Sequence, residues 1–250
     1  MTPATTAHPP GTELLPAAEG RLLGVDGCRA GWLAVEHAPG ADLAEATLHP
    51  TARSLADTPG WAWIAIDIPI GLPERGCRTC DLQARQLLGP RRSSVFPAPI
   101  RAVLPARSHG EACALSRKVQ NAGIPVQAFH LLGKIGQVDR LLRSEPARAK
   151  RMVESHPEVA FLVWNGGRPM RHPKRTAAGR AERLALVEQL HPGSFAHIRS
   201  RFRRRDVADD DILDALALLR TAGRLARGEA LLLGAPGDRD GRGLPMRIAA

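Results

Sequence analysis

Residues 21–37 read RLLGVDGCRAGWLAVEH, and this stretch decides how the fold begins. Two short apolar runs, 21–27 and 31–37, flank the connector CRA, with a glycine at each junction. This pattern predicts a β-hairpin. A third run, 43–49, follows closely and extends the predicted hairpin into a three-stranded meander.

The next apolar segment, WAWIAIDIPI at 61–70, is almost uninterrupted, which is typical of a strand buried on both faces. A further short strand is expected at 150–155, and the proline-rich stretch 89–99 is expected to be a basic loop. Helical spacing predicts helices at 77–89, 108–122, 128–142, 157–164, 177–190 and 209–225. The order predicts an α/β fold with a mixed five-stranded sheet, made of a three-strand meander plus parallel strands. Helices are expected to flank this sheet, with a helical insertion after strand four.

The composition is that of a globular chain of 250 residues, with 44% hydrophobic and 24% charged residues. A chain of this length can bury a core without disulfides or a structural metal. Residues 1–19 lack apolar periodicity and are predicted to be a disordered tail. We expect one domain over 20–230 and a flexible Gly-, Arg- and Asp-rich tail over 231–250.

The charge balance makes polyanions plausible partners, because 35 Lys and Arg outweigh 25 Asp and Glu to give a net charge of +10. Only four of the basic residues are lysines. The arginine excess, together with abundant alanine, is equally compatible with a GC-rich coding sequence. Aromatic residues amount to 4% and tyrosine is absent, which argues against an extended base-stacking platform.

The cysteines and the hydropathy predict a cytoplasmic protein without a membrane segment. Of four cysteines only Cys77 and Cys80 are close in sequence, and a lone C-x-x-C lacks the two further ligands of a zinc site. Residues 1–20 lack the basic start and apolar core of a signal peptide. No run approaches the roughly 20 apolar residues that span a bilayer.

Four aspartates stand in or beside segments that are expected to be buried. Asp26 ends the first strand, Asp67 interrupts the fourth, and Asp211 and Asp214 lie three residues apart on one side of the last helix. Buried carboxylates that lack partners are costly, and carboxylates brought together repel one another, so a divalent cation would remove both penalties. Oxygen ligands favour Mg²⁺ or Mn²⁺, and two such ions can stabilise the attacking and leaving oxygens of a phosphodiester. The four aspartates are therefore predicted to be metal ligands and catalytic residues.

Each aspartate also has an ordinary structural interpretation. Asp26 can cap a turn, and Asp214 can pair with one of the many arginines. Asp209 and Asp210 can cap the last helix. Taken singly, these interpretations are the better ones, whereas acids on strand one, strand four and the last helix together favour a shared site.

The chain resembles the ribonuclease H superfamily, whose fold is a three-stranded meander followed by βα units with acidic residues on the first strand, the fourth strand and a later helix. More narrowly, it resembles the predicted RNase H-like nuclease family, also called domain of unknown function 429. The resemblance covers about residues 22–228 and rests on these stretches: GVDGCR (24–29), GW (31–32), IDIPIGLP (66–73), CD (80–81), AR (84–85), LG (88–89), RRSSVFP (91–97), KI (134–135), ESHPEV (154–159) and DDILDAL (210–216). It implies metal-binding positions for Asp26, Asp67, Asp211 and Asp214. Strand four offers aspartate where many superfamily nucleases carry glutamate.

The stretch ESHPE at 154–158 follows the expected fifth strand, so its side chains are expected at the same end of the sheet as Asp67. Glu154 and His156 are predicted to line the site, His156 as a general base, a metal ligand or a residue that orients one. The alternative is a plain helix start, with Pro157 at the first helical position and Glu158 stabilised by the helix dipole.

Substrate contacts are predicted for Arg91, Arg92, Ser93 and Ser94, because guanidinium groups and hydroxyls match phosphate chemically. A solvated surface loop is an equally good interpretation of these four residues. Lys134 lies on an apolar helix and is also predicted to bind substrate, although a lysine can extend from such a helix to solvent.

Two functions follow from these residues. The first is a nuclease that hydrolyses phosphodiesters of nucleic acid with Mg²⁺ or Mn²⁺ at the four aspartates. The second is a non-catalytic or nucleotide-binding protein on an RNase H-like or actin-like scaffold, since actin-like ATPases also use a strand-end aspartate to bind phosphate through a cation. The expected partner is nucleic acid or a nucleotide.

Overall fold

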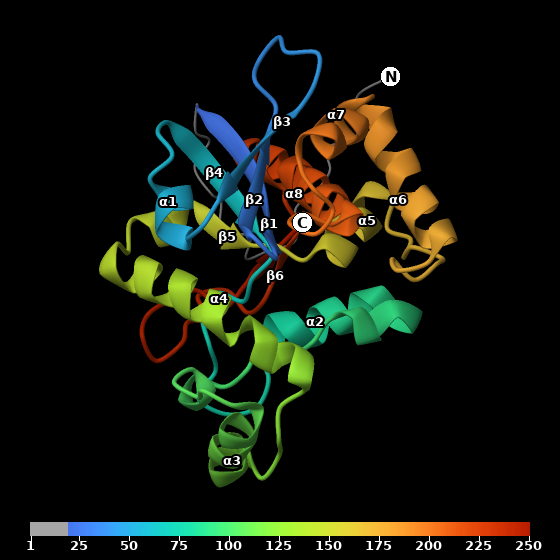
Figure 1. The fold of residues 1–250 in the computed structure, drawn as a ribbon. Helices are drawn as coiled ribbons and strands as arrows, with labels where there is room; N and C mark the ends of the chain where they lie inside the picture. Colours follow the sequence, from blue (N-terminus) through green and yellow to red (C-terminus); the bar gives the residue numbers. More distant parts are fainter. Residues whose placement is uncertain (1–19) are drawn as a thin grey trace, which may run out of the picture.

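The computed structural model describes residues 20–250, and the predicted tail over 1–19 lies outside these described residues. The described chain forms a mixed five-stranded sheet in the order β3-β2-β1-β4-β5, with helices on both sides (Figure 1). The strands are β1 (Arg21–Cys28), β2 (Gly31–Glu36), β3 (Glu45–His49), β4 (Trp61–Ile66) and β5 (Met152–Glu154). β1, β2 and β3 pair antiparallel, whereas β4 runs parallel to both β1 and β5. The prediction of an α/β fold with a mixed five-stranded sheet is confirmed.

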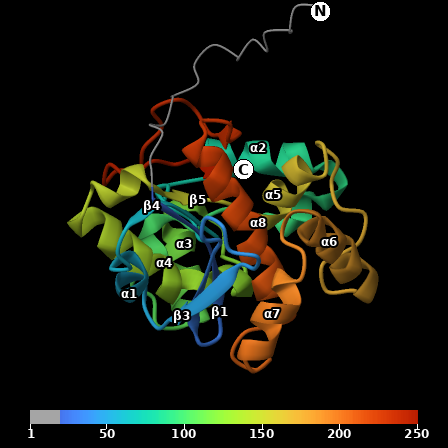
Figure 2. The same cartoon turned by 90° about the horizontal axis from the view of Figure 1, so that it is seen from above.

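Two layers of helices cover the sheet, with α1 and α4 on one face and α8 on the other (Figure 2). The helices are α1 (Ala52–Ala56), α2 (Thr79–Leu88), α3 (His109–Gln120), α4 (Val126–Ser144), α5 (Pro157–Trp164), α6 (Ala177–Leu190), α7 (Ser194–Arg201) and α8 (Asp209–Ala226). Three short 3₁₀ turns are η1 (Gly89–Ser94), η2 (Arg101–Val103) and η3 (Arg148–Lys150). Among the helices of residues 20–250, none combines the length and apolarity needed to cross a bilayer.

The strand period of two divides β1 between the two helical layers. Leu23 and Val25 are buried in the cluster that contains α1 and α4, so Gly24 and Asp26 face α8. At Gly24 the helix comes so close that an added Cβ would lie 2.0 Å from the backbone nitrogen of Leu219. Only glycine permits this approach. The contact fixes α8 against the strand that ends at Asp26.

The chain between β4 and β5 forms a helical insertion that contains α2, α3 and α4, and α3 lies at its far end from the sheet (Figure 1). β4 ends at Ile66, so Asp67 follows the strand directly where the sequence predicts a strand as far as residue 70. The proline at position 69 explains the early end, because proline cannot donate a hydrogen bond to a sheet.

The last 20 residues differ from the flexible tail expected over 231–250. They contain β6 (Leu232–Leu233) and β7 (Ile248–Ala249), which pair antiparallel, and Ala249 bridges to Ser155 beside β5. Asp240 is 7% exposed and accepts hydrogen bonds from the backbone N–H groups of Leu72 and Leu244. These contacts order a segment whose composition alone looks loose.

Candidate functional site

Asp26 and Asp67 lie side by side at the carboxyl ends of two parallel strands. Val25 pairs with Ile66 in the register of β1 and β4, and the Asp67 N–H donates to the Val25 carbonyl at 2.9 Å. Each aspartate is the next residue after such a partner, so both side chains project toward α8. The Gly27 N–H donates to Asp26 Oδ1 at 2.8 Å, which fulfils part of the predicted turn-capping role.

The first turns of α8 bring Asp211 and Asp214 to the same place. The Asp211 carboxylate accepts the Ala208 N–H at 2.7 Å, so it also caps its own helix. Asp214 lies one turn further along and is 1% exposed. The charge of each raises the pKa of Asp26, as expected for aspartates of β1 and α8 that lie near one another although 188 positions of sequence separate them (214 − 26).

Burial and mutual repulsion disfavour ionisation of these carboxyl groups. Burial is the largest cause of the raised pKa of Asp26, followed by the charges of Asp67 and Asp214. Burial also raises the pKa of Asp67, of Asp214 and of Asp211, the last to about 6. The site therefore carries more negative charge than its surroundings solvate, and positive charge is favoured there.

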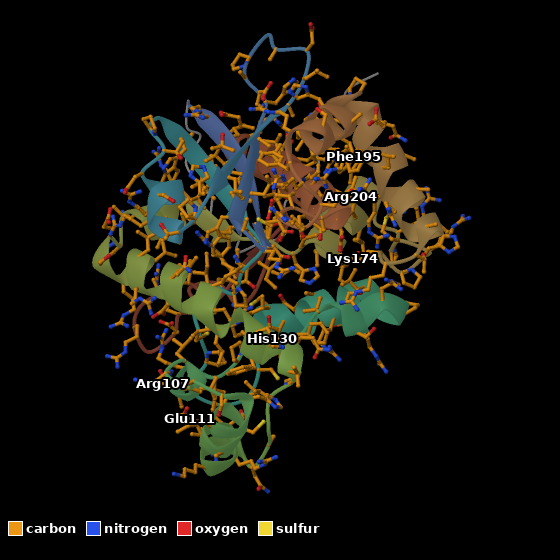
Figure 3. The ribbon with its side chains drawn as sticks, in the orientation of Figure 1. Arg107, Glu111, His130, Lys174, Phe195 and Arg204 are labelled. Carbon is orange, nitrogen blue, oxygen red and sulfur yellow. The ribbon has the colours of Figure 1, made fainter. Side chains whose placement is uncertain are left out.

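Lys174 supplies part of this positive charge, and nothing in the sequence pattern indicates it. It lies on the segment that joins α5 to α6 (Figure 3), and its Nζ donates to Asp214 Oδ2 at 2.8 Å. The Asp214 carboxylate is the largest cause of the raised pKa of Lys174, and the charges of Asp26 and Asp67 add to it. We call Asp26, Asp67, Asp211, Asp214 and Lys174 the central cluster. Asp214 thus pairs with a lysine rather than with an arginine.

One oxygen of the central cluster has no partner. Asp214 Oδ1 is buried and has no hydrogen bond to any of the described residues. A buried acceptor left in this state costs about 1–3 kcal/mol, more when it is charged. Its other oxygen is bound to Lys174, so the free oxygen is the part of the cluster best prepared to receive a further cation.

His156 links the central cluster to the basic loop. Its Nδ1 accepts the Glu158 N–H at 3.2 Å, which makes it the N-cap of α5, and Nε2 lies 3.3 Å from the Ser94 carbonyl oxygen. Because Nδ1 accepts, the ring proton is on Nε2, and Nε2 donates to Ser94. A positive charge on the His156 ring would lower the pKa of Asp67, which places the ring near that carboxylate as well as near η1. The helix-start interpretation therefore holds for His156, and its role in the site stays a prediction.

The basic loop of the sequence is the 3₁₀ turn η1, which carries Arg91, Arg92, Ser93 and Ser94. Arg85 on α2 donates to the carbonyl oxygens of Arg92 and Val95, which fixes the backbone of this turn. Ser94 is tied to His156 through its carbonyl. The structure therefore places the four predicted phosphate-binding residues on the flank of the central cluster, without a contact to the four aspartates.

Glu154 is turned away from the central cluster by Arg78. Arg78 Nη1 and Nη2 donate to the two Glu154 carboxylate oxygens at 2.6 and 2.7 Å, and Arg78 also donates to both oxygens of Asp81. Burial raises the pKa of Glu154 to about 7, although the Arg78 charge opposes this shift. Glu154 Oε2 further accepts the Ile70 N–H at 2.7 Å. Glu154 thus holds the segment that follows Asp67 and has Arg78 as its counter-charge.

Lys134 on α4 also lies beside the central cluster. Its Nζ donates to the Gly31 carbonyl and lies 4.6 Å from the centre of the Trp32 ring. Burial lowers its pKa, and the charges of Asp26 and Asp211 oppose that shift. The side chain is partly buried and its ammonium is held at the Gly31 carbonyl, so substrate binding by Lys134 stays a prediction.

Glu158 is a further acid beside the cluster. It is 4% exposed, pairs with the buried Arg183, and raises the pKa of Asp214. Its Oε2 is buried and has no hydrogen-bond partner within residues 20–250. The sequence shows it as the last residue of ESHPE but gives no indication of its contact with α6.

The carboxylates of the central cluster are ligands that Mg²⁺ and Mn²⁺ prefer, but they are not arranged as a preformed metal site. All donors of the central cluster are carboxylate oxygens, which these ions prefer, and Asp214 Oδ1 is unpartnered. Within residues 20–250, however, no three His, Cys, Asp or Glu side chains are grouped so that they could hold an ion as they stand. The ammonium of Lys174 lies among the carboxylates instead.

A family model described as "Protein of unknown function (DUF429)" matches residues 24–239, which includes every residue of the central cluster. No curated protein and no solved structure is significantly similar to the chain.

Proposed function

The chain belongs to the DUF429 family, and we propose that it is a divalent-metal-dependent nuclease of the RNase H-like superfamily. One observation carries this proposal. Asp26, Asp67 and the pair Asp211 and Asp214 come from three separate elements and converge where β1 and β4 end, with one buried oxygen unsatisfied. The strand order β3-β2-β1-β4-β5, an antiparallel meander followed by parallel strands, supports the superfamily because it is the arrangement that the resemblance implies.

The central cluster would hold Mg²⁺ or Mn²⁺ through Asp26, Asp67, Asp211 and Asp214. When bound, such ions supply a Lewis acid for the phosphate and lower the pKa of a water molecule. The protein's own contribution is position: the β1–β4 register aligns Asp26 with Asp67, and the Gly24 contact holds α8 so that its aspartates reach them. Catalysis of phosphodiester hydrolysis depends mainly on such fixed positions and charges.

The flanks of the cluster would bind the substrate. Arg91, Arg92, Ser93 and Ser94 on η1 offer phosphate-binding groups on one side, and Lys134 offers an ammonium on the other. His156 fixes η1 through the Ser94 carbonyl, so its role in this proposal is to orient the phosphate-binding turn.

The direct test is hydrolysis of labelled RNA, DNA duplex and DNA junction substrates in Mn²⁺ or Mg²⁺. We expect cleavage of at least one substrate by the wild-type protein and none by Asp26→Asn, because the neutral amide is a much poorer ligand. Equal cleavage by both proteins would point to a contaminating nuclease, and no cleavage of any substrate would contradict catalysis.

Nucleic-acid affinity is expected to be electrostatic and only weakly dependent on sequence, because arginine is abundant and aromatic residues are scarce. Log K should fall by about 0.9 per neutralised duplex phosphate per decade of salt. Replacing Arg91 and Arg92 with alanine should therefore flatten the slope by about 1.8, measured by fluorescence anisotropy over a salt series.

The matched control for this experiment is Arg107→Ala with Arg117→Ala. Both arginines are exposed; Arg107 lies beside α3 (Figure 3) and Arg117 lies on α3. The slope of this double variant should equal that of the wild type. An equal loss of slope in both double variants would mean that η1 is not the phosphate site.

A nucleotide-binding protein without catalysis is the second candidate function. The Lys174–Asp214 ion pair favours it, because it neutralises part of the acidic charge without a metal ion. Binding of a nucleoside triphosphate together with no affinity for any polynucleotide at low salt would support this second candidate.

A further inference from the structure

We propose that Lys174 is a resident cation of the central cluster that competes with divalent metal, so that metal binds only when the Lys174–Asp214 ion pair opens. This inference rests on the proposed metal-binding function and specifies how that site is regulated. It follows from where the lysine lies, which charges surround it and how it is attached to the fold.

The Lys174 ammonium supplies positive charge to the carboxylates that the metal ion would bind. Its Nζ is 2.8 Å from Asp214 Oδ2, and Asp26 and Asp67 also interact with it. A dication brought next to this ammonium would be repelled, because like charges in a partly buried site repel each other more strongly than in water. Metal and the engaged lysine therefore exclude each other.

A single ammonium does not satisfy the cluster. Asp26, Asp67 and Asp214 keep raised pKa values although Lys174 opposes the shift at each of them, and Asp214 Oδ1 stays without a hydrogen bond among the described residues. A doubly charged ion could neutralise more of these carboxylates and bind the unpartnered oxygen. The structure thus provides both a competitor and a reason for metal to displace it.

The attachment of Lys174 allows displacement without unfolding. The residue lies in the connection 165–176 between α5 and α6, and no helix or strand includes it. The backbone around it is fixed, since the Thr176 hydroxyl donates to the Pro173 carbonyl and the N–H groups of Arg171 and His172 donate to Glu182. Its side chain is 39% exposed, so rotation of the four-carbon stem alone can carry the ammonium to solvent.

Competition between Lys174 and the metal ion determines whether a substitution of Lys174 raises or lowers the affinity for metal. If the lysine and the metal oppose each other, removing the ammonium must strengthen metal binding by the factor with which metal weakens the ion pair. Lys174→Met keeps the length of the side chain and deletes its charge. We expect the Mn²⁺ dissociation constant to fall by about tenfold, within the roughly 5- to 150-fold range typical of coupled sites.

The measurement is Mn²⁺ binding followed by electron paramagnetic resonance of the free ion, which requires no activity. Lys118→Met, an exposed lysine on α3, is the matched control and should bind Mn²⁺ as the wild type does. Tighter binding by Lys174→Met alone supports the inference. Unchanged or weaker binding by Lys174→Met, with the wild type binding Mn²⁺, overturns the inference and leaves the proposed function standing. Absence of binding in all three proteins overturns both.

A second experiment uses the wild-type protein, so it tests the inference even if Lys174→Met does not fold. Acetylation by an amine-reactive ester is followed by peptide mass spectrometry, with and without Mn²⁺. We expect the rate at Lys174 to rise several-fold when Mn²⁺ is added, while Lys118 and Lys150, both exposed, keep their rates. A rate at Lys174 that does not change at saturating Mn²⁺ would overturn the inference.

Discussion

Replacing Arg78 with methionine is expected to lower the free energy of unfolding by about 3–5 kcal/mol, which is the cost of removing one partner from a buried ion pair. Arg78 is 2% exposed, and its guanidinium donates to Asp81, to Glu154 and to the carbonyl oxygens of Ile70 and Gly71. Methionine would leave two buried carboxylates without a counter-charge. For a domain of this size the melting temperature should fall by roughly 6–20 °C.

The effect should depend on burial and not on the loss of an arginine as such. Arg75→Met is the matched control. Arg75 lies three residues before Arg78, is exposed, and within residues 20–250 donates only to the Val119 carbonyl. We expect it to change stability by much less than Arg78→Met. Adding Asp81→Asn and Glu154→Gln to Arg78→Met should restore part of the lost stability, since both unpaired charges are then removed. Thermal unfolding of the four proteins measures this, and an undiminished melting temperature in Arg78→Met would contradict the structural role of the network.

The hydrogen bonds of Arg78 and Glu154 also fix the backbone next to the central cluster. Glu154 accepts the Ile70 N–H and Arg78 donates to the Ile70 carbonyl, so both hold the segment that begins at Asp67. A strand-end glutamate looks the same in the sequence whether it points into a site or toward a buried arginine. This is why the sequence predicts that Glu154 lines the site but gives no indication of its ion pair with Arg78.

The positions of Asp26 and Asp67 could be predicted because strand periodicity is local. Each residue follows an apolar strand, and two parallel strands that end together bring their next residues together. The aspartates of α8 could be predicted in the same way from helical spacing. The sequence also showed which acids interrupt apolar segments, and that is the information needed to locate the cluster.

Lys174 could not be predicted, because its contact with Asp214 spans 40 positions and joins an irregular segment to a helix. No period relates the two residues. The ordered end of the chain was missed for a similar reason: Asp240 is fixed by Leu72 and by an ion pair with Arg101, both far away in sequence. Composition describes such a segment only in isolation, whereas its order comes from distant partners.

Binding of a divalent metal ion is also expected to stabilise the folded protein strongly. A ligand at about 100 times its dissociation constant stabilises the native state by roughly 2.7 kcal/mol. For this chain the corresponding rise in melting temperature is roughly 5–11 °C. We expect Mn²⁺ or Mg²⁺ to produce this rise in the wild type, since the buried carboxylates of the central cluster lack sufficient positive charge.

Asp67→Asn should abolish the rise without harming the fold. The raised pKa of Asp67 shows that its ionised form is disfavoured in the folded protein, so a neutral amide of the same size should leave the metal-free melting temperature unchanged or higher. Asp42→Asn is the matched control, because Asp42 is exposed in the connection between β2 and β3. It should keep the full metal response.

The most direct measurement is therefore thermal unfolding of the wild type, Asp67→Asn and Asp42→Asn over a titration with Mn²⁺. We expect a saturable rise in melting temperature for the wild type and for Asp42→Asn, and none for Asp67→Asn. An equal rise in all three proteins, or no rise in the wild type at any Mn²⁺ concentration, would contradict a metal site at the ends of β1 and β4.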